Sequence, residues 1–169
     1  MRIKFIVIAV TAAVFASAAN AQTRQPSAPK GPIVIKSKQQ VADIQKSLEK
    51  KPGNTNEDVV AAAGKQTRVA VFHDEKRVDD LNEVHDGSDD VYYVLEGTAT
   101  LLLGGSLVDP KETSPGEWRA KTAVGGQRYV IKKGDLVFVP RGTPHQRTVT
   151  GKGFSMILIK IFETAQPAK

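Results

Sequence analysis

One segment, residues 134–145, restricts the fold of this chain more than any other part of the sequence. It has the pattern G-x5-P-x-G-x2-H, in which an apolar run follows Gly134, Pro140 and Gly142 make a tight turn, and His145 ends the pattern. Such residues predict a buried strand, a sharp reversal and a new strand that begins with histidine. The segment therefore predicts an imidazole held at a strand end of a β-fold.

A second segment, residues 83–97, has a matching organisation. It begins with Glu83 and His85, passes through Asp90, and continues as a strand-like run to Gly97. The two segments together hold two of the chain's three histidines. Imidazole and carboxylate groups are common ligands of divalent metals, so this placement predicts one shared metal site.

Short strand-like runs separated by glycine or proline turns occupy most of the chain after residue 66. No long helical period lies between them, and this spacing favours an antiparallel sandwich or barrel. We therefore predict an all-β fold with one β-barrel domain over residues 67–165. Residues 104–126 are expected to form a long loop. The predicted strands are residues 68–72, 91–103, 127–131, 136–139 and 154–162.

The first 21 residues are predicted to be a signal peptide. Arg2 and Lys4 form a basic start, residues 5–18 are mainly apolar, and residues 19–21 have the A-x-A pattern of a cleavage site. The apolar run is short and rich in alanine for a membrane span. We expect a Sec-type signal cleaved after Ala21, a periplasmic or secreted protein, and no stable membrane insertion after cleavage. An uncleaved N-terminal anchor is the alternative.

Two further segments precede the predicted barrel. Residues 22–36 contain three prolines among small polar residues and are expected to be a linker. Residues 37–66 are expected to be a helical extension, because Ser37 and Gln40 form a capping box. Residues 54–65 show no clear pattern of their own. The apolar residues at helical spacing are Val41, Ile44 and Leu48.

The composition excludes several kinds of site. The chain has no cysteine, so thiol catalysis, disulfides and thiolate metal sites are excluded. The formal net charge is +6, but the basic residues are mixed with acidic ones and form no stripe with aromatic platforms. We therefore expect no nucleic-acid partner.

Strand geometry gives a first arrangement for the candidate ligands. Alternate residues of a strand share a face, so Asp90 and Tyr92 should point the same way, and Glu83 and His85 should do so as well. If His145 approaches from across the barrel, two imidazoles and up to two carboxylates meet. Two histidines and one carboxylate with open positions suit Fe(II), Mn(II) or Zn(II).

These motifs resemble those of the cupin superfamily, over roughly residues 67–163. The second cupin motif, G-x5-P-x-G-x2-H-x3-N, is present from Gly134 to His145, with Val149 in place of the terminal asparagine. The first motif, G-x5-H-x-H-x3,4-E-x6-G, is matched in part. His85 stands for its second histidine, Asp90 for its glutamate, and Gly97 for its last glycine. Glu83 replaces the first histidine, and Arg77 replaces the leading glycine.

The resemblance implies a cupin-type jelly roll and a divalent metal, which cupins commonly hold through three histidines and a glutamate. The metal ligands expected here are Glu83, His85, Asp90 and His145. Zinc, manganese and iron are joint candidates. A cupin that keeps its shape without an ion is the alternative.

Other residues have a structural and a functional interpretation. His73 is expected to be a surface or hydrogen-bonded histidine. Asp89 is one residue out of phase with Asp90 and should point outward. Arg147 shares the face of His145, so it either anchors substrate or faces solvent. Trp118 and Arg119 either cap the barrel mouth, with Arg119 clamping an anionic substrate, or pack outside the barrel.

Two functions follow as hypotheses. The first is an exported metal-dependent enzyme acting on a small molecule, of oxygenase, isomerase or lyase type by analogy to cupins, with Glu83 or Tyr92 as general base or acid. The second is a periplasmic cupin that binds a small ligand without metal or catalysis. A homodimer paired through outer strands is a further expectation from the resemblance.

Overall fold

The computed structural model describes residues 26–29 and 31–168. The chain divides into two compact units, Met1–Pro32 and Ile33–Lys169. Every described helix and strand lies in the second unit. The predicted signal peptide lies outside the described residues. Within the described residues, no helix has the length and apolar character needed to span a membrane.

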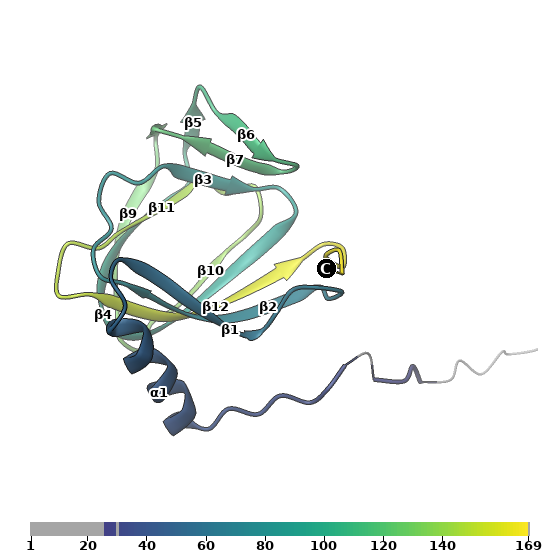
Figure 1. Ribbon diagram of the computed structural model, residues 1–169. Helices are drawn as coiled ribbons and strands as arrows, with labels where there is room; N and C mark the ends of the chain where they lie inside the picture. The colour runs from purple at the N-terminus through teal and green to yellow at the C-terminus, as the bar shows by residue number, and fades with distance from the viewer. Residues whose placement is uncertain (1–25, 30, 169) are drawn as a thin grey trace, which may run out of the picture. The chain divides into compact units, whose positions relative to one another are not determined.

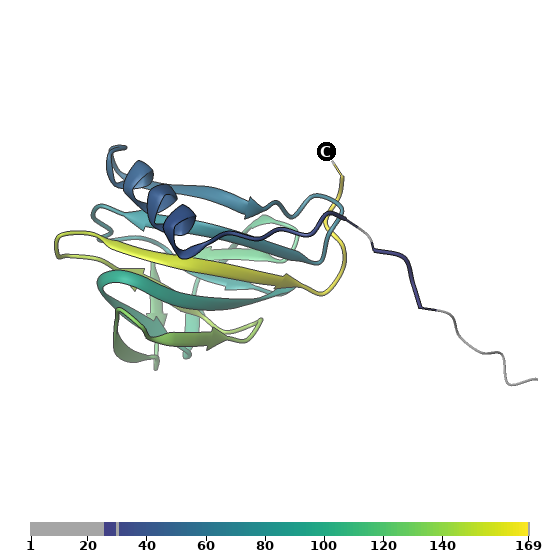
Figure 2. The ribbon, with the colours of Figure 1, turned by 90° about the horizontal axis from the view of Figure 1, so that it is seen from below.

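The predicted short helix is confirmed as α1, Lys38–Glu49. Its capping box is present, because the Ser37 side chain accepts from the backbone of Gln40 while the Gln40 side chain accepts from the backbone of Ser37. Leu48 is fully buried. The helix packs against strands β1, Asn54–Val60, and β2, Thr67–Asp74 (Figure 2).

Among the described residues, twelve strands accompany this helix, and every pairing between them is antiparallel (Figure 1). The main sheet has the order β1-β2-β12-β4-β11-β3-β7-β6, and β9 and β10 also pair with β4. A second sheet joins β5 and β8. The strands are β1 Asn54–Val60, β2 Thr67–Asp74, β3 Asn82–His85, β4 Ser88–Leu103, β5 Ser106–Val108, β6 Lys111–Ser114, β7 Glu117–Ala120, β8 Thr122–Val124, β9 Gln127–Lys132, β10 Leu136–Val139, β11 His145–Thr148 and β12 Phe154–Phe162.

The long strand β4 connects the two layers of the barrel. Its first half pairs with β10 and β12, and its second half pairs with β9 and β11. Between the halves, Gly97 has a φ of 81°. A Cβ atom there would lie 2.2 Å from the carbonyl oxygen of Gly153. Glycine at this position therefore allows one strand to bend and serve both layers.

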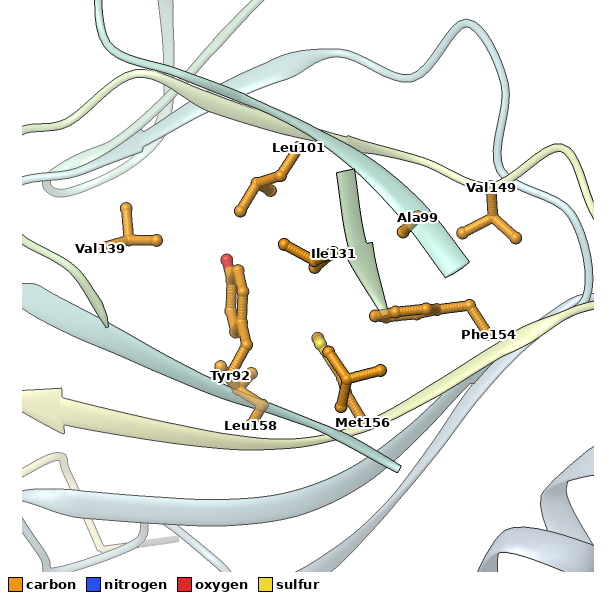
Figure 3. Close-up of a cluster of buried hydrophobic side chains, with 10 residues drawn as sticks. Tyr92, Ala99, Leu101, Ile131, Val139, Val149, Phe154, Met156 and Leu158 are labelled. Atoms are coloured by element: carbon orange, nitrogen blue, oxygen red, sulfur yellow. The ribbon is translucent and has the colours of Figure 1, made fainter. Parts of the chain in front are cut away.

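The interior between the layers is filled by apolar side chains of β4, β9, β10 and β12 (Figure 3). The all-β prediction with a short N-terminal helix is confirmed. The buried cluster consists of Tyr92, Val94, Ala99, Leu101, Ile131, Val139, Val149, Phe154, Met156 and Leu158.

The structure corrects two predictions about the regions outside the main strands. The extension over residues 37–66 is helical only to Glu49, because residues 54–60 pair with β2 as strand β1. Residues 104–126 are not a long loop, since they contain β5, β6, β7 and β8. These four strands have three or four residues each and little apolar alternation, so only their pairing partners reveal them.

Candidate metal centre

Glu83, His85 and His145 come together inside the barrel. Strand β3 carries Glu83 and His85 on one face, and β11 begins at His145 directly opposite Glu83. One potential ligand atom from each residue lies within 4.8 Å of the others, and Glu83 Oε1 is 3.3 Å from His145 Nε2. The predicted approach of His145 from a second strand therefore brings two imidazoles and one carboxylate together.

The far nitrogen of each imidazole is held by a hydrogen-bond acceptor. His145 Nδ1 donates to the carbonyl oxygen of Thr143 at 2.9 Å, and His85 Nδ1 donates to Glu117 Oε2 at 2.6 Å. A carbonyl or carboxylate can only accept, so Nδ1 carries the proton and Nε2 keeps its lone pair when the ring is neutral. His145 Nε2 is buried and has no hydrogen-bond partner among the described residues. The lone pair of this nitrogen is therefore available to bind a metal ion.

The electrostatics also favour the ligating forms. Burial alone would raise the pKa of Glu83, but the close approach of the His145 ring and the charges of the protonated His145 and His85 rings and of Arg119 hold this pKa far below its ordinary value. Burial, and then the charge of Lys160, lower the pKa of His85, although nearby carboxylates oppose this. Near neutral pH the site therefore offers an ionised carboxylate and a neutral His85, the forms that bind metal.

Asp90 lies beside this group. It points inward with Tyr92, as predicted, and its Oδ2 is 3.7 Å from His85 Nε2 and 3.9 Å from His145 Nε2. However, its Oδ1 is 3.0 Å from Lys160 Nζ, and Asp90 is not part of the ligand group. Its role as a metal ligand stays a prediction. Lys160 was not singled out from the sequence, although it continues the inward row of Met156 and Leu158 on β12.

Tyr92 is almost completely buried and belongs to the core cluster. Its hydroxyl donates to Asp90 Oδ2 at 3.3 Å. Burial, followed by the charge of Asp90, raises the pKa of this phenol well above its ordinary value, so the hydroxyl keeps its proton. Tyr92 therefore both fills the barrel and presents a proton donor at its cavity.

The other predicted residues separate into those near the ligand group and those away from it. Asp89 points away and pairs with Arg141 at 2.9 Å, as its phase predicts. His73 is buried, and its Nδ1 shares a hydrogen bond of 3.0 Å with Ser155. Trp118 donates from Nε1 to Asp86 at 2.6 Å. Arg119, by contrast, reaches Glu83 at 3.1 Å.

The strands that carry the two sequence motifs form one site. Motif residues before the turn pair with β4, since Val139 lies opposite Asp90, and the histidine after the turn pairs with β3. The two halves thus meet within one antiparallel barrel. The chain has a cupin fold.

No protein-family model and no curated protein matches the chain. Solved structures with similar folds include the DMSP lyase DddQ from Ruegeria pomeroyi, at 15% identity and a TM-score of 0.48 over 68% of this chain and 49% of that chain. KdgF from Halomonas sp. has 14% identity and a TM-score of 0.48 over 68% and 85%. A double-stranded β-helix protein from Klebsiella pneumoniae has 17% identity and a TM-score of 0.48 over 69% and 83%. The chain therefore spans only about half of DddQ, and such distant likenesses decide neither activity nor ligand.

A cavity of about 250 Å³ opens beside Glu83 and His85, two of the three candidate ligands. Larger hollows, of about 530 Å³ beside His73 and about 660 Å³ along α1, contain none of the three candidate ligands. We therefore take the smaller cavity as the functional one, because the candidate chemistry lies there. Its lining residues are Arg68, Phe72, Arg77, Glu83, His85, Asp90, Tyr92, Arg119, Arg147, Met156, Leu158 and Lys160.

Proposed function

We propose that this cupin binds a divalent metal through Glu83, His85 and His145 and acts on a small molecule in the barrel cavity. The observation that carries the proposal is the pair of imidazoles whose Nδ1 atoms are fixed by Thr143 and Glu117. Each ring then presents Nε2 toward a shared centre with an ionised carboxylate. Hydrogen bonds from the nitrogen that does not bind the metal orient histidine ligands in metal proteins.

The donor set of two imidazoles and one carboxylate suits iron, manganese or zinc. A bound metal with open positions would supply Lewis-acid polarisation of a substrate oxygen. Two side chains beside the metal would interact with the substrate. The Tyr92 hydroxyl can donate a hydrogen bond, and the Asp90 carboxylate, which pairs with Lys160, can accept a proton. Oxygenase, isomerase or lyase chemistry remains our proposal for the reaction class.

Metal titration tests this function. Adding Zn²⁺, Mn²⁺ or Fe²⁺ to the metal-free protein should raise its unfolding temperature, because a ligand that binds only the folded state stabilises it. The His85→Ala variant should lose most of this rise. If none of the three ions stabilises the wild-type protein, the metal function is wrong.

A second candidate function is binding of a small ligand without metal. One observation favours it: both carboxylates already have cationic partners, Glu83 with Arg119 at 3.1 Å and Asp90 with Lys160 at 3.0 Å. Such pairing could neutralise the cavity without an ion. Ligand-induced stabilisation that is unchanged by a metal chelator would favour this function over the first.

We propose, in addition, that the protein is exported and that its signal peptide is cleaved after Ala21. The basic, apolar and A-x-A regions of the sequence support this. Amino-terminal sequencing of protein from the periplasmic fraction should begin at Gln22. An intact Met1 in the envelope fraction would favour the anchor instead.

We also propose a homodimer that pairs through the outer face of β4 and β10. Tyr93, Leu136 and Phe138 lie on paired strands and are 44%, 70% and 58% exposed. An exposed apolar sheet face of this kind is commonly an interaction surface. Light scattering should give twice the chain mass for the wild type and the chain mass for Phe138→Glu, whereas a monomeric wild type would contradict the dimer.

A further inference from the structure

The cavity contains a buried arginine that the metal site does not use. Arg147 lies two residues after His145 on β11, and the two side chains share a face. Its side chain is only 8% exposed, and it lines the cavity that also contains Glu83 and His85. The sequence left open whether Arg147 faces substrate or solvent, and the structure places it inside.

The contacts of Arg147 fix its guanidinium but leave most of its donors unused. Nε donates to Asp74 Oδ2 at 2.7 Å, and the Asp74 carboxylate is buried. The guanidinium carbon lies 5.9 Å from the centre of the Tyr92 ring and 5.8 Å from that of Phe154. Within the described part of the chain, Nε is the only atom of this side chain with a hydrogen-bond partner. A guanidinium has five N–H donors, so its terminal Nη groups remain available.

The surroundings of this arginine favour an anionic partner. Asp74 is shared, because Arg77 also lies 3.4 Å from it. The cavity is lined by five cationic side chains and two carboxylates, and a divalent metal held by Glu83 would add further positive charge. A planar guanidinium with free Nη groups matches the two oxygens of a carboxylate. A ligand that covered these donors without offering acceptors would leave them unsatisfied, which is costly.

We propose that the ligand of this cavity is a small organic carboxylate, bound by the Nη groups of Arg147, with a second polar group turned toward Glu83, His85 and His145. The cavity volume of about 250 Å³ suits a small acid. It is below the range of about 300–1,000 Å³ that is typical for drug-sized ligands. The placement of the ligand's second polar group rests on the proposed metal function. Binding of the carboxylate by Arg147 does not rest on it.

Calorimetric titration with succinate and its uncharged diamide tests the proposal at constant ionic strength, on the mature chain with and without Zn²⁺. Succinate should bind in both states, and the diamide should bind at least about tenfold more weakly, since a charged hydrogen bond is lost. Arg147→Lys should weaken succinate binding by roughly ten- to hundredfold, because the lysine keeps the charge but lacks the paired Nη donors that match the two carboxylate oxygens.

Arg141→Gln is the matched control, because Arg141 also pairs with an aspartate but does not line the cavity. It should leave succinate affinity unchanged. If Arg147→Lys does not fold, the double variant Arg147→Gln/Asp74→Asn removes both charges of the pair and should show the same loss.

Equal affinity for the diamide, or an unchanged affinity in the Arg147 variants, would overturn the proposal. So would the absence of binding by malonate, succinate and glutarate alike. Failure of the metal function is seen separately as an absence of Zn²⁺ stabilisation, because Arg147→Lys leaves all three candidate metal ligands in place.

Discussion

At the scale of single residues, the site depends on contacts that fix each ring before any ligand arrives. His85 and His145 both use Nδ1 to donate, to a carboxylate and to a backbone carbonyl. This leaves the Nε2 of His145 3.3 Å from Glu83 and the Nε2 of His85 3.7 Å from Asp90. Without such contacts, an imidazole could rotate or exchange its proton between nitrogens. The Glu117 contact is the one that a side-chain substitution can remove.

Glu117→Gln should weaken metal binding by roughly ten- to hundredfold, the usual effect of losing a contact that orients a ligand. The glutamine removes the negative charge that holds the His85 Nδ1 proton. Isothermal titration with Zn²⁺ measures the change. Glu112→Gln is the control on the same hairpin, because Glu112 accepts from the backbone of Gly116 and does not contact the site. Equal affinities in the two variants would contradict the role of Glu117.

The stability of the metal-free protein should fall as the pH falls below the ordinary His85 pKa of 6.5. Burial lowers the pKa of His85 in the folded state, so the unfolded chain takes up the proton first. The contribution of neutral His85 to the free energy of unfolding is present above pH 6.5 and is lost as the pH falls toward the pKa of His85 in the folded state. Urea unfolding measured between pH 7.5 and pH 5 gives the free energy of unfolding at each pH. This free energy should change less with pH in His85→Asn than in the wild type, and an identical pH dependence would exclude His85 as the cause.

The residues of the site differ in how far the sequence predicted them. Glu83, His85 and His145 could be predicted because strand ends and a turn place them within recognisable motifs. Glu117 was not singled out, and Arg119 was left between the barrel mouth and the outside of the barrel, because β7 reaches the site only by pairing with β3. Lys160 could have been found from the inward alternation along β12.

At the scale of elements, the bend of β4 connects the two layers that enclose the cavity. The bend requires both a positive φ at Gly97 and close contact with the backbone of Gly153. Other glycines have a positive φ but open surroundings. Gly134, for example, has a φ of 91° and nothing within 4 Å of an added Cβ.

Gly97→Ala should therefore destabilise the protein by more than about 3 kcal/mol, because strain and a backbone clash add together. Gly134→Ala should cost only about 1–2 kcal/mol, the penalty of a positive φ alone. Denaturant unfolding of both variants measures the difference. Similar losses in the two variants would show that the contact with Gly153 does not constrain β4.

The predictability of the elements follows their apolar pattern. Strands β10 and β12 were predicted with the bounds that the structure gives, because each is a largely apolar run between turns. Strand β1 was missed because it is mainly polar, and strands β5 to β8 were missed because each has only three or four residues. Their stability comes from pairing with neighbouring strands, which a single sequence does not display.

At the scale of the whole molecule, two layers of antiparallel strands enclose an apolar core (Figure 1, Figure 3). A small polar cavity lies beside this core. Three buried polar side chains, His85, Asp90 and His145, come together from β3, β4 and β11. Others are paired elsewhere, such as His73 with Ser155. Buried charges and unpaired donors are costly unless they serve a partner. Metal binding by the ligand group would account for the unpartnered Nε2 of His145.

Metal content is the most direct test of this account. The mature protein would be purified without an affinity tag, and its metals measured by mass spectrometry beside His145→Ala and the control His73→Gln, which changes a histidine outside the ligand group. We predict close to one zinc, manganese or iron per chain in the wild type and in His73→Gln, and a nearly complete loss in His145→Ala. A wild-type protein that contains no metal and takes up none when it is supplied would contradict the metal centre.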